Sequence, residues 1–205
     1  MNTIECMKML KLRELTMEQH KNAERTKFAK KLVSGKITPG EYITYLHNMR
    51  VVYSWIEITG KKLGVLEGLK NICRKTAITY DYEQMCQVAG MEINIPLCKA
   101  TTEYVDYVSW ITDPEKILAH IYVRHMGDLS GGQIIAKKLE GRYPINFYKF
   151  AEDTEVLKDK LREKLNNDMA DEAMLAFDYA HKIFLELESL DDMESAGEDP
   201  EISGE

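Results

Sequence analysis

The sequence lacks the features of disulfide-stabilised, membrane-spanning and nucleic-acid-binding proteins. Its four cysteines, Cys6, Cys73, Cys86 and Cys98, form no Cys-x-x-Cys pair. No signal peptide and no apolar run of membrane-spanning length is present. We therefore expect a soluble, cytoplasmic protein without a membrane anchor, in which the reduced thiols are packing residues. Internal repeats and stripes of basic and aromatic residues are also absent, which gives no support to a role in binding nucleic acid.

Basic residues are missing from one end of the chain, and this accounts for its acidity. The net charge is -7, but residues 186–205 hold nine acidic residues and no lysine or arginine. Without that segment the remaining chain is close to +2. A length of 205 residues with 44% hydrophobic content suits one buried core. We therefore expect a single domain over residues 1–190, followed by an acidic, disordered tail over residues 191–205.

Strand-like alternation is nearly absent, whereas helical spacing of apolar residues is common. Apolar residues recur at helical spacing in one segment that Gly35 ends, and Thr38-Pro39-Gly40-Glu41 has the form of a capping box at the start of the next. An Asp113-Pro114 step opens a long helix that Gly141 ends. The predicted helices cover residues 4–34, 39–59, 80–88, 97–110, 114–140, 155–165 and 169–190. This pattern predicts an all-α, single-domain helical bundle.

Three glycines interrupt the long helix predicted over residues 114–140. They lie in Gly127-Asp128-Leu129-Ser130-Gly131-Gly132-Gln133, and each costs about 1 kcal/mol of helix stability relative to alanine. Gly127 and Gly131 are four residues apart, so they bare a strip of backbone on one face. A neighbouring helix in close approach is the common use of such a strip. A flat ligand is the alternative, and the carboxylate of Asp128 beside the strip favours it, because that group needs a partner, water or a reaction.

The residues around these glycines carry a family resemblance. The run Tyr122-Val123-Arg124-His125-Met126-Gly127-Asp128-Leu129-Ser130-Gly131-Gly132-Gln133 closely resembles the distal-helix signature of heme oxygenases. Looser similarity extends from about Leu10 to Leu190. The resemblance implies an all-helical fold in which heme b lies between a proximal helix near the N-terminus and a glycine-bent distal helix, with Gly127, Gly131 and Gly132 beside the ring.

Five histidines could bind the heme iron, although a histidine chosen blindly is more often structural. His20 differs from the others by its neighbours, because Arg13 lies two turns before it, about 10 Å along the same face, and Glu24 lies one turn after it. This segment resembles the proximal helix of heme oxygenases. The resemblance implies that His20 is the iron ligand and that Glu24 hydrogen-bonds its other ring nitrogen. The other candidates are His47, His120, His125 and His181.

Lys158 and Arg162 share a helix face and could clamp two carboxylates. Acidic residues between them indicate an ordinary solvated surface on local grounds. The family resemblance implies instead that both residues, with Arg13, contact the heme propionates and fix the rotation of the ring. Phe177 matches a family position that packs on the heme. Ala180 departs from the asparagine of the animal enzymes, so no polar contact is expected there.

The resemblance implies a reaction in which heme is both cofactor and substrate. Oxygen and electrons convert heme to biliverdin, with the IXα isomer expected, carbon monoxide and ferrous iron. Asp128 would hold water near the bound oxygen and control the proton supply, and Arg124 and Tyr122 would extend this polar network. Tyr122 is also expected to contact the heme.

Two other functions remain open at this stage. A non-enzymatic heme carrier or sensor would need His20 and the propionate contacts, but it would not need a carboxylate beside the oxygen. A thiaminase-like hydrolase on a similar scaffold would need a nucleophilic cysteine in a central pocket, and no cysteine lies in the glycine-bearing helix. The heme oxygenase interpretation is therefore preferred.

The electron donor is inferred from the missing anchor. In lacking an anchor, this chain resembles the soluble bacterial, cyanobacterial and plastid heme oxygenases, which take electrons from reduced ferredoxin. An acidic ferredoxin suits the slightly basic body if lysine and arginine side chains cluster near the heme edge. A bilin reductase is the expected downstream partner.

Overall fold

The computed structural model describes residues 12–89, 95 and 97–196. Regular structure in these ranges is helical, and none of it is strand. The helices are α2 (Met17–Arg25), α3 (Lys27–Ser34), α4 (Pro39–Lys62), α5 (Lys75–Ala89), α6 (Lys99–Ser109), α7 (Pro114–Leu139), α8 (Thr154–Arg162) and α9 (Ala170–Ala196), with short 3-10 helices η1 (Lys70–Ile72), η2 (Asn146–Tyr148) and η3 (Asn167–Met169). The predicted all-helical architecture is confirmed.

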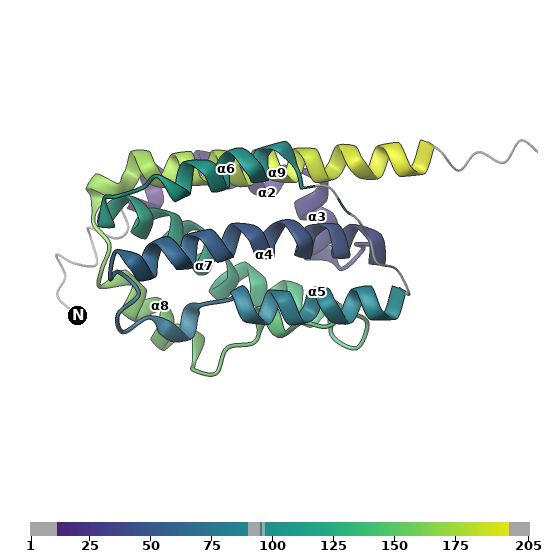
Figure 1. Ribbon diagram of the computed structural model, residues 1–205, viewed down its shortest axis with the longest axis horizontal. Coiled ribbons are helices and arrows are strands. Elements are labelled where there is room, and N and C mark those ends of the chain that lie inside the picture. Colours follow the sequence, from purple (N-terminus) through teal and green to yellow (C-terminus); the bar gives the residue numbers. More distant parts are fainter. Residues whose placement is uncertain (1–11, 90–94, 96, 197–205) are drawn as a thin grey trace, which may run out of the picture.

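Helices α4 and α7 run through the middle of the bundle, with α6 and α9 on one side and α5 and α8 on the other (Figure 1). The central helix α4 packs against α5, α6 and α7, while α7 also contacts α3, α8 and α9. The side chains of Tyr42, Leu46, Met49 and Ile56 on α4 are fully buried. Helix α7, which carries the glycines, is therefore enclosed by packed neighbours over much of its length.

The predicted boundaries of α4 and its neighbour follow from local chemistry. Thr38 Oγ1 accepts a hydrogen bond from the backbone N–H of Glu41 at 3.2 Å, and Glu41 Oε2 accepts one from the N–H of Thr38 at 2.7 Å. This reciprocal pair is the predicted capping box. Gly35 ends α3 with a φ of +73°, a conformation that glycine adopts without a steric penalty.

The prediction of one continuous helix over residues 4–34 is wrong in the part that the structure describes. A turn at Thr16 separates a first helical stretch from α2, and Thr26, with a ψ of 151°, separates α2 from α3. Thr26 Oγ1 accepts a hydrogen bond from the N–H of Ala29, so this threonine starts a new helix. Threonine competes with helix continuation through such local bonds. Residues 4–11 lie outside the described residues.

Several boundaries lie outside their predicted positions. Helix α5 begins at Lys75, before the predicted residue 80, α8 ends at Arg162, before the predicted residue 165, and α9 continues to Ala196, beyond Leu190. The first six residues assigned to the acidic tail are thus helical. Residues 197–205 lie outside the described residues, and for them the tail remains a prediction.

The cysteines whose environment is described have the predicted packing role. Cys98 belongs to the buried core, and Cys73 and Cys86 are half-buried against it, all three as free thiols. Cys6 lies outside the described residues. Within the described ranges, none of the helices has the length and apolar character needed to cross a membrane.

Candidate active site

The glycines of α7 serve two different purposes. A Cβ atom added to Gly127 or Gly131 would meet no described atom within 4 Å, whereas one added to Gly132 would lie 2.8 Å from Cδ1 of Tyr148. Gly132 therefore permits close packing of η2 against α7, and Gln133 secures it by donating to the carbonyl of Tyr148 at 3.0 Å. The strip formed by Gly127 and Gly131 faces open space. Among the described residues no neighbouring helix covers it, which favours a ligand over helix packing.

Asp128 lies beside this strip and is buried, with 7% of its surface exposed. Tyr53 of α4 donates its hydroxyl to Asp128 Oδ2 at 2.6 Å. Burial raises the pKa of Asp128 to about 7, although His125, Tyr53, Arg74 and Arg124 each oppose that rise. The carboxyl group can consequently gain or lose a proton near neutral pH.

Arg124 is buried one helical turn before Asp128, and its Nε and Nη2 atoms have no hydrogen-bond partner among the described residues. Its guanidinium lies 5.2 Å from the centre of the Tyr104 ring. The Tyr104 hydroxyl is hydrogen-bonded to His120 Nδ1 at 2.8 Å, and His120 Nε2 lies 2.9 Å from Glu172 Oε1. Unpartnered buried donors are costly, typically about 1–3 kcal/mol. The arginine is thus poised to donate to water or to a ligand.

His20 lies on α2, and its side chain is 43% exposed. His20 Nε2 is 3.5 Å from Glu24 Oε1, and the ring of Phe177 on α9 meets the His20 ring edge-on with 5.3 Å between centres. The structure thus brings together His20 and Glu24, which the sequence assigned to the proximal helix, and Phe177, which matches a family position that packs on the heme. A half-exposed imidazole of this kind is accessible to a metal.

The basic residues predicted to hold carboxylates lie on α8 and near the start of the described chain. On α8, Lys158 pairs with Glu155 and Arg162 with Asp159, each at 2.7 Å. Arg13 and Arg162 lie close enough to Tyr122 to lower its pKa, which burial raises. Two of the three groups that the sequence assigned to the propionates, Arg13 and Arg162, therefore lie near Tyr122.

Different groups act on Tyr122 and on Asp128. Burial raises the pKa of Tyr122, while Thr16, Arg13 and Arg162 lower it; burial also raises the pKa of Asp128, while His125, Tyr53, Arg74 and Arg124 lower it. Six residues along a helix turn a side chain by about 120° relative to the first, whereas four bring Arg124 and Asp128 onto one face. The nearby charges of Arg13 and Arg162 suit the ligand-binding assignment of Tyr122, and among the described residues no hydrogen bond joins Tyr122 to Asp128 or Arg124.

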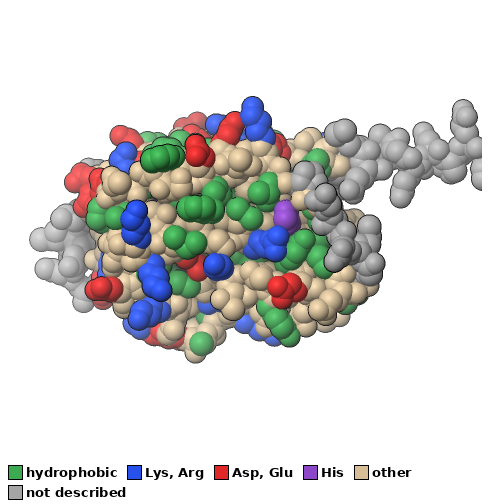
Figure 2. Space-filling model, in the orientation of Figure 1, with side chains coloured by type: hydrophobic (Ala, Val, Ile, Leu, Met, Phe, Trp, Pro, Cys, Tyr) green, Lys and Arg blue, Asp and Glu red, His purple; other side chains and the backbone are tan. Residues whose placement is uncertain are grey.

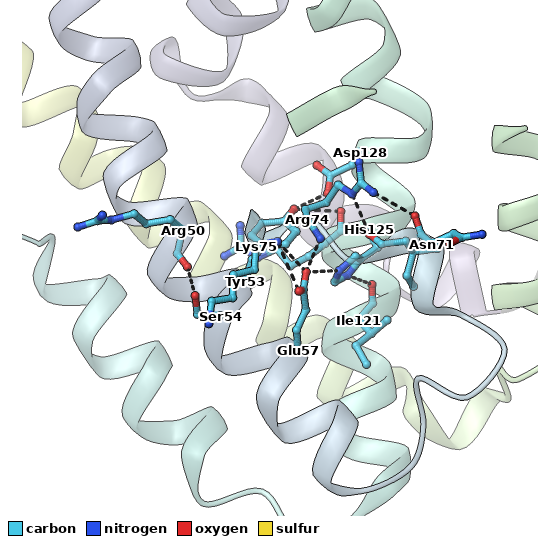
Figure 3. A network of polar contacts seen from close by, with 12 residues as sticks. Arg50, Tyr53, Ser54, Glu57, Asn71, Arg74, Lys75, Ile121, His125 and Asp128 are labelled. Carbon is cyan, nitrogen blue, oxygen red and sulfur yellow. Dashed lines mark hydrogen bonds and ion pairs between the residues drawn. The ribbon is translucent and has the colours of Figure 1, made fainter. Parts of the chain in front are cut away.

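Sequence reasoning missed the partners of Asp128 on other elements. Tyr53 lies on α4 at helical spacing from Met49 and Ile56, and its ring is buried while its hydroxyl reaches Asp128. Arg74 and Glu57 lie on the same buried network (Figure 3). A buried tyrosine hydroxyl requires a partner, which was the available signal, but the sequence does not say which partner.

The fold matches known proteins. A solved structure of heme oxygenase-1 from Synechocystis in complex with heme aligns with a TM-score of 0.77 and 28% identity, covering 92% of this chain and 95% of that one. Heme oxygenase from Leptospira interrogans aligns with a TM-score of 0.76 and 29% identity, covering 86% and 97%. The fold defines a class of all-helical proteins that includes these heme oxygenases.

Sequence comparison gives the family. The heme oxygenase family model matches residues 8–186. Heme oxygenase 1 of Synechocystis is 32% identical over 200 residues, covering 86% of this chain and 83% of the relative. Heme oxygenase of Rhodella violacea is 31% identical over 204 residues, covering 88% and 86%. This chain belongs to the heme oxygenase family.

Proposed function

We propose that this protein opens heme oxidatively to biliverdin, carbon monoxide and ferrous iron, using oxygen and electrons from reduced ferredoxin. The observation that carries the proposal is the open strip at Gly127 and Gly131 beside Asp128, a buried carboxyl group with a pKa of about 7. The strip accommodates a flat ring, and the carboxyl group supplies proton control next to it. We expect the IXα isomer, which would then pass to a bilin reductase.

The residues present suit heme as the substrate. His20 is accessible for iron ligation and carries Glu24 and Phe177 beside it. Arg124 has two buried nitrogens without a partner, as expected of a group that faces a ligand or its water. Arg13, Lys158 and Arg162 would contact the two propionates, with Tyr122 between the arginines. Gly127 and Gly131 would lie against the ring, and Gly132 would keep the distal helix close to η2.

Bound heme would supply the iron that binds oxygen and the ring carbon that is oxidised. The chain's own contribution begins with Asp128, whose carboxyl oxygens would hold water and exchange a proton at neutral pH. Tyr53 donates to Oδ2 of that carboxyl and leaves Oδ1 for water. Arg124 would donate to the same water network from one turn away. The bare glycine strip keeps side chains away from the oxygen side.

A heme carrier or sensor is the main alternative. Such a protein would need His20 and the basic residues, but a buried carboxyl that titrates near neutral pH would give it no benefit. Adding ascorbate or reduced ferredoxin to the hemin-loaded protein separates the two functions. An enzyme would convert the bound-heme absorbance into that of a bile pigment and release carbon monoxide. A carrier would retain the heme spectrum.

Ferredoxin as donor rests on charge and on the cyanobacterial relatives. The exposed face over α4, α5 and α6 carries apolar side chains, including Trp55 and Ile58, among charges of both signs (Figure 2). That face therefore offers no uniform charge to an acidic donor. The basic groups near the predicted propionate edge, Arg13, Lys158 and Arg162, are the better match. Ferredoxin-driven turnover should fall as ionic strength rises, and turnover that is indifferent to salt would contradict electrostatic docking there.

A further inference from the structure

A polar stripe runs along one face of α7 from its exposed start toward the glycines. Lys116, His120, Arg124 and Asp128 follow one another at intervals of four residues, so their side chains leave the helix on nearly the same side. Lys116 is exposed, whereas the other three residues are buried. The proposed reaction uses Arg124 and Asp128 from this stripe and leaves His120 without a role.

Arg124 is a buried guanidinium without a counterion among the described residues. No carboxylate in that part of the chain forms an ion pair with it, and its Nε and Nη2 atoms lack hydrogen-bond partners there. The aromatic ring of Tyr104 on α6 contacts it instead, with 5.2 Å between the guanidinium carbon and the ring centre. The face of an aromatic ring attracts a cation, and it does so more strongly away from water. The position of the Tyr104 ring is therefore expected to set where Arg124 points its unpaired donors.

Two further helices hold the Tyr104 ring, which is fully buried. It stacks on the ring of Tyr179 on α9, with 4.6 Å between centres and 17° between planes. Its hydroxyl oxygen lies 2.8 Å from Nδ1 of His120 on α7. The ring cannot turn without losing the stacking or the hydrogen bond, so α7 and α9 together fix its orientation.

Glu172 on α9 determines the direction of that hydrogen bond. Its Oε1 lies 2.9 Å from Nε2 of His120 and accepts a hydrogen bond from the Tyr107 hydroxyl at 2.7 Å, and its Oε2 lies 3.5 Å from Nζ of Lys116. An ionised carboxylate can only accept, so Nε2 of His120 carries the hydrogen. In a neutral ring Nδ1 is then an acceptor, and Tyr104 donates its hydroxyl hydrogen to it.

The pKa values of the two titratable groups agree with this direction. Although burial raises the pKa of Glu172, the hydrogen bonds from His120 and Tyr107 lower it to about 2. Burial lowers the pKa of His120; Glu172 opposes this, and the charges of Arg124 and Lys116 add to it. Near neutral pH, Glu172 is thus the acceptor and His120 the neutral ring that the hydrogen-bond geometry requires.

We propose that Glu172, His120 and Tyr104 are positioning residues that act in series on Arg124. Glu172 fixes which nitrogen of His120 carries the hydrogen, and His120 holds the Tyr104 hydroxyl. The Tyr104 ring then holds the guanidinium one helical turn before Asp128, with two donors left for a ligand or its water. The series joins α6, α7 and α9, and its geometry does not depend on the reaction proposed above.

The first experiment determines which ring nitrogen of His120 carries a hydrogen in the ligand-free full chain. Long-range proton–nitrogen NMR of protein labelled with 15N-histidine distinguishes the two nitrogens. The spectrum of His120→Phe assigns the signals, or contacts with the Tyr104 ring do so in the wild type. We expect a hydrogen on Nε2 and a bare Nδ1 at pH 7. A hydrogen on Nδ1, alone or together with one on Nε2, would overturn the proposal without any variant of Tyr104.

The second experiment follows the Nε–H signal of Arg124 in the same ligand-free protein, labelled with 15N-arginine and assigned from Arg124→Lys. The ring current of Tyr104 should displace this signal in the wild type. Tyr104→Leu, which removes the ring, should abolish the displacement and speed the exchange of this hydrogen with water about tenfold or more. Tyr104→Phe keeps the ring but frees it from His120, so part of the displacement should be lost.

Tyr107→Phe is the matched control, because it removes a hydroxyl from the same Oε1 of Glu172 and leaves the bond between His120 and Tyr104 in place. The Arg124 signal should keep its wild-type position and exchange rate in this control. A wild-type signal in folded Tyr104→Phe would overturn the role of His120 and Glu172. A wild-type signal in folded Tyr104→Leu would assign Tyr104 to packing alone.

The consequence for turnover rests on the proposed function. Hemin-loaded Tyr104→Phe should bind heme as the wild type does, because His20 is unchanged, but it should open heme several-fold more slowly, because Arg124 is less well placed. Tyr107→Phe should match the wild type. If the Arg124 signal responds to the Tyr104 variants but no protein degrades heme, the proposed reaction fails and the positioning role stands. If heme is degraded and the Arg124 signal does not respond, the positioning role fails and the reaction stands.

Discussion

The two sides of the candidate heme site are built differently. On the α2 side, His20 and Glu24 are 43% and 66% exposed and lie 3.5 Å apart. On the α7 side, Asp128, Arg124 and His125 are buried and linked to α4 and to the start of α5. Charges on the exposed side interact weakly because water screens them, whereas burial strengthens those on the other side. Binding and proton control are therefore assigned to separate regions, and each can be changed without the other.

The largest effect is expected at the exposed side, because one residue, His20, is proposed as the iron ligand. His20→Ala should lose most heme retention and reduce turnover at least a hundredfold, and added imidazole should restore part of both, since it can fill the cavity and bind iron. Hemin absorbance and bile-pigment yield measure this, with His47→Ala as the control. A normal heme spectrum in His20→Ala would assign the iron to another histidine.

The buried side predicts a pH-dependent stability difference. The pKa of Asp128 is raised in the folded protein, so this group favours folding when protonated and loses that contribution as pH rises from about 4 through 7. The loss is about 1.4 kcal/mol for each pH unit in that window. The side chain of Asp128→Asn stays neutral, so the free energy of unfolding of this variant should increase relative to that of the wild type as pH rises.

Urea unfolding of both ligand-free proteins at several pH values between about 4 and 8 measures this difference. The gap between Asp128→Asn and the wild type should widen steadily up to about pH 7 and then level off. A gap that is constant across this range would show that Asp128 titrates at its ordinary pKa.

The glycines of α7 offer a comparison within one helix. Gly131→Ala should raise the free energy of unfolding of the ligand-free protein by up to about 1 kcal/mol, because its Cβ meets open space and alanine is the better helix former. Gly132→Ala should destabilise it, because its Cβ would lie 2.8 Å from the Tyr148 ring. Chemical denaturation measures both changes in the free energy of unfolding. Equal changes would contradict the assignment of Gly131 to an open strip and of Gly132 to a packed contact.

The smallest effect is expected for the three basic residues proposed to contact the propionates. Single alanine substitutions of Arg13, Lys158 and Arg162 remove contacts worth about 0.2–1 kcal/mol each, so the isomer mixture of biliverdin should shift slightly. The triple variant should shift it more clearly while still degrading heme. Chromatography of the extracted pigment measures the mixture. A single unchanged biliverdin isomer from the triple variant would show that these residues do not orient the ring.

The sequence predicted the helices that carry strong local signals. The capping box at Thr38 and Glu41 and the left-handed Gly35 are local features, and both occur where they were expected. The break at Thr26 was missed, because apolar spacing continues across it and one threonine is a weak signal. The glycine strip and His20 could be identified from their sequence neighbours and the family resemblance.

The buried network could not be predicted, because it joins residues that are far apart in the chain. Tyr53 and Asp128 are separated by 75 positions, and Glu57 and His125 by 68. Helical spacing shows that Tyr53 and His125 face inward, but not which side chains they meet. The place of Tyr122 in the oxygen-side network, which the family resemblance implies, stays a prediction.

The central claim is that Asp128 controls the proton supply and does not hold the heme. The direct measurement loads Asp128→Ala with hemin, adds hydrogen peroxide, and follows bile-pigment absorbance together with oxidation of a phenolic dye. We predict heme binding within a few-fold of the wild type, little ring opening, and a gain in peroxidase activity, because the proton supply beside the oxygen is no longer controlled. Ring opening at the wild-type yield without any peroxidase gain would contradict the account and leave α7 important for its shape alone.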